Sequence, residues 1–180
     1  AKPIIPPIDG IDLENIQPLR SVKDADQIKE KMKDAEKVTI IGAGLIGLEM
    51  AESFSELGKE VTVVELMNKI LPQFSQDITK YVDDHLREQG VNLVLGDGVN
   101  SFKGDEKVER IITSSGQKID TDFVLLSLGI KPEVNLAKQA GIGIGKTGAI
   151  EVNERMETNV EDVYAAGDCA ETINLLTDQR

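Results

Sequence analysis

Short apolar runs alternate with longer amphipathic stretches over the first two thirds of the chain. The apolar runs are rich in β-branched residues, which is typical of buried strands. They lie at 38–41, 61–65, 91–95 and 123–127. Helical periodicity marks three longer stretches, at 24–36, 48–57 and 75–89. A strand, a helix and a second strand in succession form a right-handed parallel crossover. The pattern therefore predicts an α/β fold built on a Rossmann-like parallel sheet.

The pattern changes after residue 95. Short strand-like pieces at 99–102, 108–113 and 118–120 are separated by turn residues, which predicts a three-stranded antiparallel β-meander inserted into the α/β unit. The pattern loosens from Val134 onward. Four glycines between Gly141 and Gly148 leave that stretch little room for a helix, and the apolar run at 163–166 predicts one brief strand.

The stretch at 75–89 has one apolar face at helical spacing, made by Ile78, Tyr81, Val82 and Leu86. His85, the single histidine of the chain, lies on the same face. We therefore expect His85 to pack in the core, and a role as a general base is the less favoured alternative.

Composition narrows the classes of partner and the compartment. A formal net charge of −12 argues against nucleic acid and anionic membranes as partners, since both require clustered Lys and Arg. No apolar run approaches the roughly 18 to 20 residues of a membrane span, and residues 1–7 lack the apolar segment of a signal peptide. The single cysteine, Cys169, excludes an internal disulfide and fits a reducing cytoplasm. At 180 residues, one domain with a proper core is the expectation.

A glycine-rich turn follows the first buried strand. Its sequence from Gly42 to Gly47 has the form GxGxxG, with Leu45 and Ile46 between the second and third glycines. In a strand–turn–helix context the first glycine allows a tight turn, Gly44 lets the backbone approach a pyrophosphate, and the third allows close packing of helix and strand. The N-terminus of the helix would hold the pyrophosphate through free N–H groups and the helix dipole.

Two acidic residues extend this site. Glu65 ends the next strand at the spacing expected for a carboxylate that binds the adenosine ribose, and it favours NAD(H) over NADP(H) by repelling a 2′-phosphate. Glu49 is expected in the first turn of the helix, where it either complements the dipole or contacts the nicotinamide end. A Gly-rich turn that binds another ligand, such as S-adenosylmethionine, is the alternative.

The run 38–52 resembles the NADH-domain fingerprint of the pyridine nucleotide–disulfide oxidoreductases, and the run 158–170 is similar to their late FAD-binding motif. The nearest branch resembles the CoA-disulfide reductases and NADH oxidases or peroxidases. The resemblance implies that Gly129 lies by the nicotinamide cofactor and that Gly167 and Asp168 contact the flavin. It also implies that Cys169, which follows that aspartate, is not the catalytic thiol; a small packed residue is expected there.

The family's FAD-binding glycine loop, active-site cysteine and dimerisation domain have no counterpart here. The resemblance therefore implies an NADH-binding piece, with 1–20 as the exit from an FAD domain, 21–133 as the NAD(H)-binding domain and 134–180 as a partial return to the FAD domain. The missing domains would be its partners in a homodimeric enzyme. No catalytic or metal-binding residue is predicted within the chain.

Three functions stay open on the sequence. The first is a part of an FAD-dependent oxidoreductase that passes hydride from NADH to FAD and then to a disulfide, a peroxide or oxygen. The second is a stand-alone NADH-sensing module, and the third is a methyltransferase. The motif at 158–170 favours the first, because a sensor has no use for a flavin site.

Overall fold

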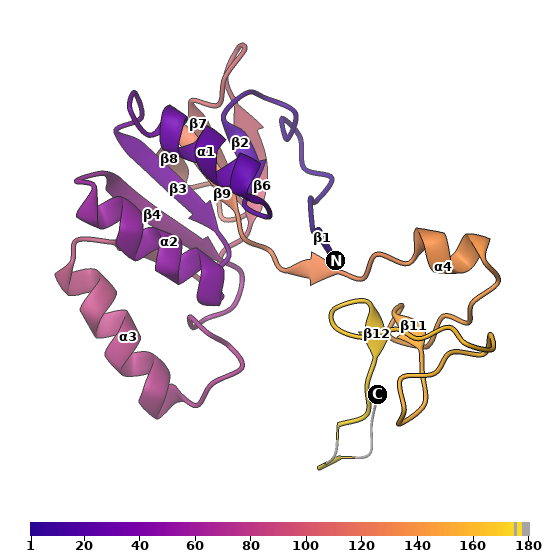
Figure 1. The fold of residues 1–180 in the computed structure, drawn as a ribbon. Coiled ribbons are helices and arrows are strands. Elements are labelled where there is room, and N and C mark those ends of the chain that lie inside the picture. Colours follow the sequence, from indigo (N-terminus) through magenta and orange to yellow (C-terminus); the bar gives the residue numbers. More distant parts are fainter. Residues whose placement is uncertain (175, 178–180) are drawn as a thin grey trace. The chain divides into compact units, whose positions relative to one another are not determined.

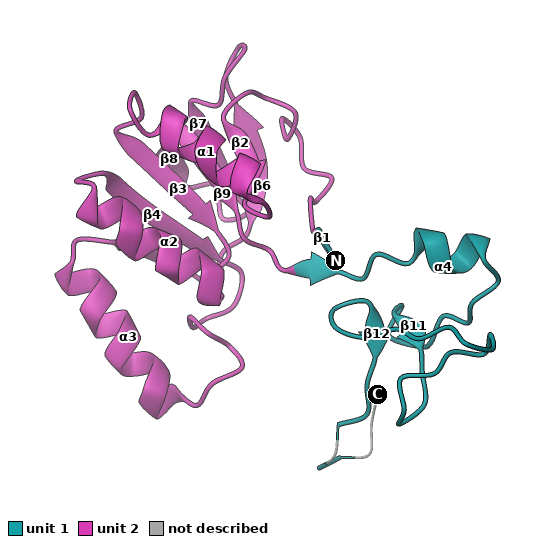
Figure 2. Ribbon diagram, in the orientation of Figure 1, with its two compact units in different colours: residues 1–2, 130–180 teal, residues 3–129 magenta. Residues whose placement is uncertain are grey.

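The computed structural model describes residues 1–174 and 176–177. The chain forms two compact units, one made of residues 3–129 and the other of residues 1–2 with 130–180 (Figure 2). The larger unit contains the glycine-rich turn, and the smaller one contains the run that resembles the FAD motif.

A five-stranded parallel sheet forms the centre of the larger unit, with strand order β2-β9-β3-β4-β5 (Figure 1). Its strands are β2 (Ile16–Pro18), β3 (Lys37–Ile41), β4 (Glu60–Glu65), β5 (Asn92–Leu95) and β9 (Phe123–Leu126). The four strands expected from the apolar runs are confirmed. The fifth, β2, was missed because it is three residues long and ends in a proline, which is tolerated at the edge of a sheet.

Three helices cover one face of this sheet: α1 (Val22–Lys31), α2 (Leu45–Glu56) and α3 (Gln76–Glu88) (Figure 1). Two of them differ from the expected ranges. α1 begins before residue 24, because Ser21 and Asp24 form a capping box, and it ends five residues earlier than expected. α2 begins inside the glycine motif at Leu45, so the motif itself supplies the first turn of the helix.

The other face of the sheet packs against the antiparallel meander of β6 (Val99–Lys103), β7 (Arg110–Thr113) and β8 (Lys118–Asp120). Side chains of β9 alternate between the two faces. Phe123 and Leu125 join the core on the helical side, whereas Val124 and Leu126 join the core on the meander side. Burial on both faces explains why the central strands are continuously apolar. The predicted α/β fold with a meander insertion is thus confirmed.

The smaller unit contains α4 (Asn135–Gln139) and a parallel pair formed by β11 (Ile150–Glu151) and β12 (Ala170–Glu171). β1 (Lys2–Pro3) pairs with β10 (Ile130–Lys131). The short helix α4 was not predicted; it ends before Gly141, and no helix forms from Gly141 to Gly148, the glycine-rich stretch where little room for one was expected. The strand expected at 163–166 does not form, since this segment makes only one isolated bridge, between Tyr164 and Glu157. A small apolar cluster that includes Val134, Ile150 and Val152 holds the unit together.

Candidate functional site

The candidate nucleotide site lies where three neighbouring parallel strands end. The glycine-rich turn follows β3, Glu65 ends β4, and Ser127 follows β9. Backbone hydrogen bonds join these ends. The N–H of Gly42 donates to the carbonyl of Val64 over 2.9 Å, and the N–H of Ser127 donates to the carbonyl of Ile41 over 2.8 Å. The carboxyl ends of parallel strands are where open α/β sheets bind ligands.

The three glycines of the motif have different surroundings. Gly42 has a φ of +105°, and a Cβ atom built on it would overlap the carbonyl oxygen of Ser127. A Cβ atom on Gly47 would overlap the carbonyl oxygen of Gly42, so the start of α2 packs directly on the turn. Gly44, in contrast, would place a Cβ atom with nothing within 4 Å. Gly42 and Gly47 are therefore required by the protein itself, whereas the space at Gly44 is open for a ligand.

The N-terminus of α2 opens at the same place. Gly44 is the N-cap residue and supplies no side-chain cap, and the first hydrogen bond of the helix runs from the N–H of Leu48 to the carbonyl of Gly44. The N–H groups of Leu45, Ile46 and Gly47 consequently have no acceptor within the helix. The side chains of Leu45 and Ile46 are half exposed, at 54% and 50%. This is the arrangement that binds phosphate oxygens through backbone N–H groups and the positive end of a helix dipole.

Glu65 is coupled to the glycine-rich turn by a direct hydrogen bond. One carboxylate oxygen accepts from the backbone N–H of Ala43, and the other accepts from the N–H of Met67, each over 2.8 Å. Ala43 is fully buried, so Glu65 satisfies an N–H group that water does not reach. A carboxylate has about four acceptor positions, which leaves capacity for two ribose hydroxyls. Sequence spacing located this residue but did not reveal that it also fixes the turn.

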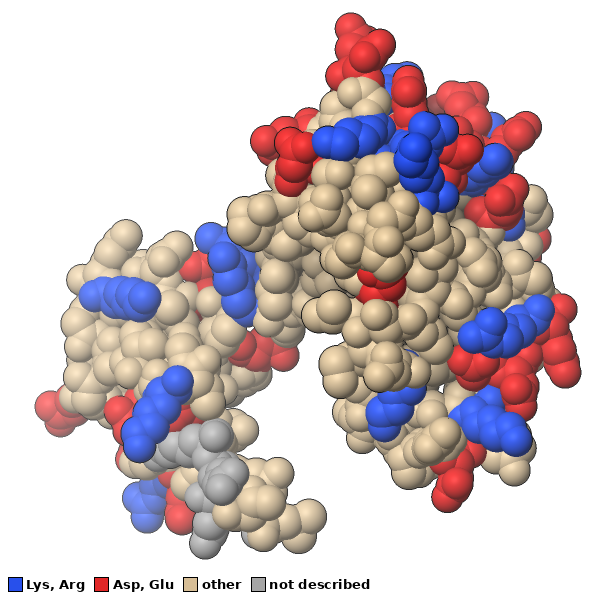
Figure 3. Space-filling model, turned by 180° about the vertical axis from the view of Figure 1, so that it is seen from behind, with Lys and Arg blue, Asp and Glu red and all other residues tan. Residues whose placement is uncertain are grey.

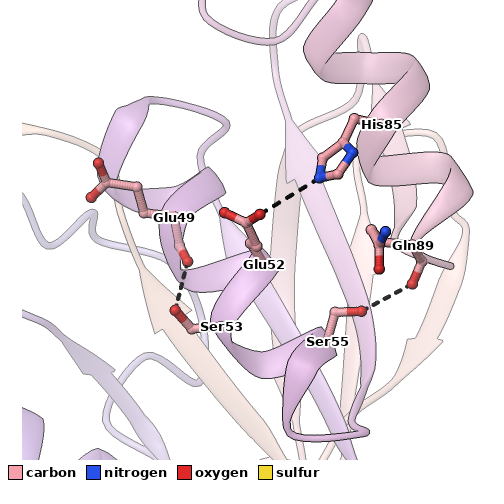
Figure 4. A network of polar contacts seen from close by, with 6 residues as sticks. All are labelled: Glu49, Glu52, Ser53, Ser55, His85 and Gln89. Atoms are coloured by element: carbon pink, nitrogen blue, oxygen red, sulfur yellow. Dashed lines mark hydrogen bonds and ion pairs between the residues drawn. The ribbon is translucent and has the colours of Figure 1, made fainter.

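Glu49 and His85 lie differently from the expectation (Figure 4). Glu49 falls in the second turn of α2, which begins at Leu45, so the first turn of the helix contains no acid. Its side chain is exposed and is directed away from Glu52 and His85. The expectation of a first-turn acid is thus wrong, because the helix begins three residues earlier than its apolar pattern indicated.

The prediction of a packed core histidine is also wrong. The His85 side chain is 52% exposed, and its Nε2 lies 3.5 Å from a carboxylate oxygen of Glu52 on α2 (Figure 4). Ile78 and Tyr81, on the same face of α3, are 54% and 79% exposed. Only Leu86 and Thr79 of α3 are buried. The apolar periodicity located the helix correctly, but only part of the predicted face, Val82 and Leu86, packs on the core.

The remaining predicted positions divide between the two units. Gly129 follows β9 in the larger unit, has a φ of +86°, and accepts a hydrogen bond from the N–H of Ile4. Gly167 and Asp168 belong to the smaller unit, and both are exposed. The Cys169 thiol is half-buried in the apolar cluster of that unit and donates to the carbonyl of Ala166 over 3.3 Å. The larger unit therefore brings together Gly42 to Gly47, Glu65 and the segment after β9 as a candidate site.

Surface charge gives no sign of a single basic patch in the view of Figure 3, where Lys and Arg side chains are interspersed with Asp and Glu. Within the described part of the chain, no helix is long and apolar enough to cross a membrane. The same residues contain no cluster of three or more His, Cys, Asp or Glu side chains that could hold a metal ion.

Comparison with known proteins agrees with this geometry. The family model described as pyridine nucleotide-disulphide oxidoreductase matches residues 1–178. This chain belongs to that family. A family member from Pyrococcus furiosus, an NAD(P)H sulfur oxidoreductase (CoA-dependent), is 46% identical over all of this chain, which spans 41% of its length. An NADH oxidase from Methanocaldococcus jannaschii is 39% identical, and this chain spans 40% of its length.

Solved structures of family members share the fold. An NAD-dependent persulfide reductase from A. fulgidus superimposes with a TM-score of 0.95 at 42% identity, covering 99% of this chain and 33% of the persulfide reductase. A water-forming NADH oxidase from Lactobacillus brevis, solved with NADH bound, gives a TM-score of 0.87 at 34% identity over 93% of this chain and 37% of the oxidase. The chain thus corresponds to about two fifths or less of the length of these family members.

Proposed function

We propose that this chain is the NADH-binding part of a flavin-dependent oxidoreductase. The observation that carries the proposal is the open space at Gly44, which faces the uncapped N-terminus of α2 and adjoins the Glu65 carboxylate at the end of β4. That combination suits a pyrophosphate and a ribose in one extended ligand. Family membership and the NADH-bound relative support the assignment.

Each part of the site has a separate task in binding. The N–H groups of Leu45, Ile46 and Gly47 would hold the pyrophosphate, and the Glu65 carboxylate would accept hydrogen bonds from the ribose hydroxyls. Glu65 also disfavours NADPH, since its negative charge would lie beside the 2′-phosphate. Gly129 would border the nicotinamide end, and Glu49 is a candidate for contact at the same end. NADH supplies a hydride and FAD accepts it when both are bound.

The smaller unit would contribute to an FAD site. Asp168 and Gly167 are exposed, and no side-chain hydrogen bond engages Asp168 within the described residues, so its carboxylate is available to a hydroxylated ligand such as the flavin side chain. The contacts that Asp168 can offer are too weak to bind flavin alone, because a single hydrogen bond contributes only about 0.5–1.5 kcal/mol. The assignment of 1–20 and 134–180 to an FAD domain is part of this proposal.

The intact enzyme would pass hydride from NADH through FAD to a disulfide, a peroxide or oxygen, and it would be a homodimer. The names of the relatives, which include sulfur oxidoreductases and NADH oxidases, support a sulfur compound or oxygen as the acceptor. A cytoplasmic location belongs to the same proposal and is supported by the presence of one cysteine in the chain.

Calorimetric titration with NADH and NADPH tests the proposal. The unmodified chain should bind NADH more tightly than NADPH. Glu65→Ala should weaken NADH binding by about 1–3 kcal/mol and narrow the gap to NADPH. Glu60→Ala is the matched control, because Glu60 is an exposed acid at the opposite end of the same strand. Tighter binding of NADPH by the unmodified chain would refute the role of Glu65, and absence of saturable NADH binding would refute the proposed function.

A further inference from the structure

A cleft of about 540 Å³ lies between α1 and α2, remote from the strand ends that form the nucleotide site. Its volume falls within the range of about 300–1,000 Å³ that is usual for small-molecule sites. Buried side chains form its floor: Ile28, Met32 and Phe54, exposed by only 3%, 5% and 2%. Leu19, Met50 and Leu57 form its walls.

The wall residues leave apolar surface open to solvent. Leu57, immediately after α2, lines the same cleft as the buried Phe54, yet it is 64% exposed. A cleft with a buried apolar floor and an exposed apolar wall binds hydrocarbon in preference to water, because burial of each CH₂ group contributes about 0.8 kcal/mol.

The charged residues at the cleft are all of one sign. Lys29, Lys33 and Lys59 line it, and none of its lining side chains is acidic. The whole chain has 32 acidic and 20 basic residues, so a lining with lysines alone departs from the composition of the protein. Lys33 pairs with Glu30 over 2.6 Å.

Lys59 is the distinctive member of this group. It is half-buried, and its ammonium has no ion-pair or hydrogen-bond partner among the residues that the structure describes. Its backbone N–H donates to the carbonyl of Phe54 over 3.1 Å, which fixes the residue against the carboxyl end of α2. A lysine whose stem lies along apolar surface is suited to a carboxylate whose hydrocarbon part lies on that surface.

We propose that the α1–α2 cleft binds a single-chain amphiphilic carboxylate, with its hydrocarbon on Ile28, Met32 and Phe54 and its carboxylate at Lys59. The site is separate from the proposed NADH site. The cleft is lined by α2 from Met50 onward, whereas the glycine-rich turn supplies the N-cap and the first turn of that helix. Occupancy of the cleft and NADH binding can therefore be measured independently.

An NMR titration of the ¹⁵N-labelled chain with sodium decanoate, and in parallel with decyltrimethylammonium, tests the proposal. The two probes share a chain length and differ in the sign of the head group. Because the protein has a net charge of −12, non-specific attraction favours the cation, so a preference for decanoate identifies a local site. We expect saturable decanoate shifts confined to α1, α2 and the turn at Lys59, with at least tenfold weaker binding of the cation.

Variants separate the head-group contact from the apolar contact. Lys59→Met retains an apolar stem and should weaken decanoate binding about tenfold, the usual scale for loss of a charge-assisted hydrogen bond. Lys118→Met, a change of an exposed lysine on β8, should leave the affinity unchanged. Ala25→Trp fills the cleft from its exposed rim and should abolish binding; it also introduces the only Trp, whose fluorescence reports folding.

The proposal would be overturned by equal or tighter binding of the cation, by unchanged decanoate affinity in Lys59→Met, or by shifts that map outside α1, α2 and the turn at Lys59. Binding of an acidic amphipathic peptide at the cleft without binding of decanoate would assign the cleft to a protein partner and would likewise overturn it. Absence of NADH binding by the unmodified chain would instead refute the proposed function and would leave the proposal for the cleft unaffected.

Discussion

Two glycines of the turn are expected to serve different purposes: Gly44 leaves space for the ligand, whereas Gly42 is required by the fold. Gly44 adopts φ −80° and ψ −178°, an extended conformation open to any residue, and a Cβ atom there meets nothing within 4 Å. Gly44→Val should therefore change the free energy of unfolding by no more than about 1 kcal/mol, the scale of an N-cap substitution. Its side chain would occupy the space of the pyrophosphate, so NADH affinity should fall at least a hundredfold, or about 2.8 kcal/mol.

Gly42→Ala should behave in the opposite way. At a φ of +105° the alanine would have to adopt a backbone conformation that L-residues disfavour, at a cost of roughly 1–2 kcal/mol. Its overlap with the carbonyl oxygen of Ser127 forces a backbone shift that costs about 1–3 kcal/mol more. The free energy of unfolding should therefore fall by about 2–5 kcal/mol, against a typical total of about 5–15 kcal/mol.

Urea unfolding followed by circular dichroism, together with calorimetric titration of NADH, distinguishes the two variants. Gly44→Val should be stable and unable to bind, and Gly42→Ala should be clearly destabilised. Unchanged NADH affinity in a folded Gly44→Val protein would show that the ligand binds elsewhere. Unchanged stability in Gly42→Ala would refute the close contact between the turn and the segment after β9.

Three further predictions follow from other parts of the structure. A hydrogen bond from the Ser115 hydroxyl holds the pKa of Asp97 below its ordinary value, so this carboxylate contributes stability at neutral pH that is lost as the pH falls below about 4. In thermal melts recorded between pH 7 and pH 2, the melting temperature of Asp97→Asn should therefore fall less with decreasing pH than that of the unmodified chain. His85→Ala should change the free energy of urea unfolding by less than about 1 kcal/mol, because the pair with Glu52 is exposed; a larger loss would mean that His85 is packed after all. The purified chain should show no visible flavin absorbance, because the hydrogen bonds that Asp168 can offer are too few to bind flavin; a yellow protein would contradict this.

Local pattern was sufficient to predict the strands and the turn that make up the candidate nucleotide site. The β-branched runs before Gly42 and up to Glu65 are buried on both faces of the sheet, so their apolar character is continuous and easily recognised. The glycine spacing then fixed the position of the turn and of the helix that follows it. The start of that helix was not recognised, because Leu45 and Ile46 are exposed and do not fit the apolar stripe that identifies its later turns.

Features that depend on distant neighbours could not be read from the pattern. Periodicity identified α3, but only packing decides which side is covered, and Tyr81 and His85 face solvent. Edge strand β2 has no periodic signal, because it is fixed by pairing with β9. The paired residues Ile16 and Val124 are more than 100 residues apart in the chain. The hydrogen bond from Ala43 to Glu65 joins two elements 22 residues apart and likewise requires the folded sheet.

The most direct test of the proposed NADH site is an NMR titration of the ¹⁵N-labelled chain with NADH that maps the affected backbone amides. The arrangement of the turn predicts saturable shifts concentrated in Gly42 to Leu48, with a second group at Glu65 to Met67. Those groups contain the free N–H groups of α2 and the N–H that donates to the Glu65 carboxylate. Saturable shifts that leave both groups unmoved, or no saturable binding, would contradict the assignment of this turn as the NADH site.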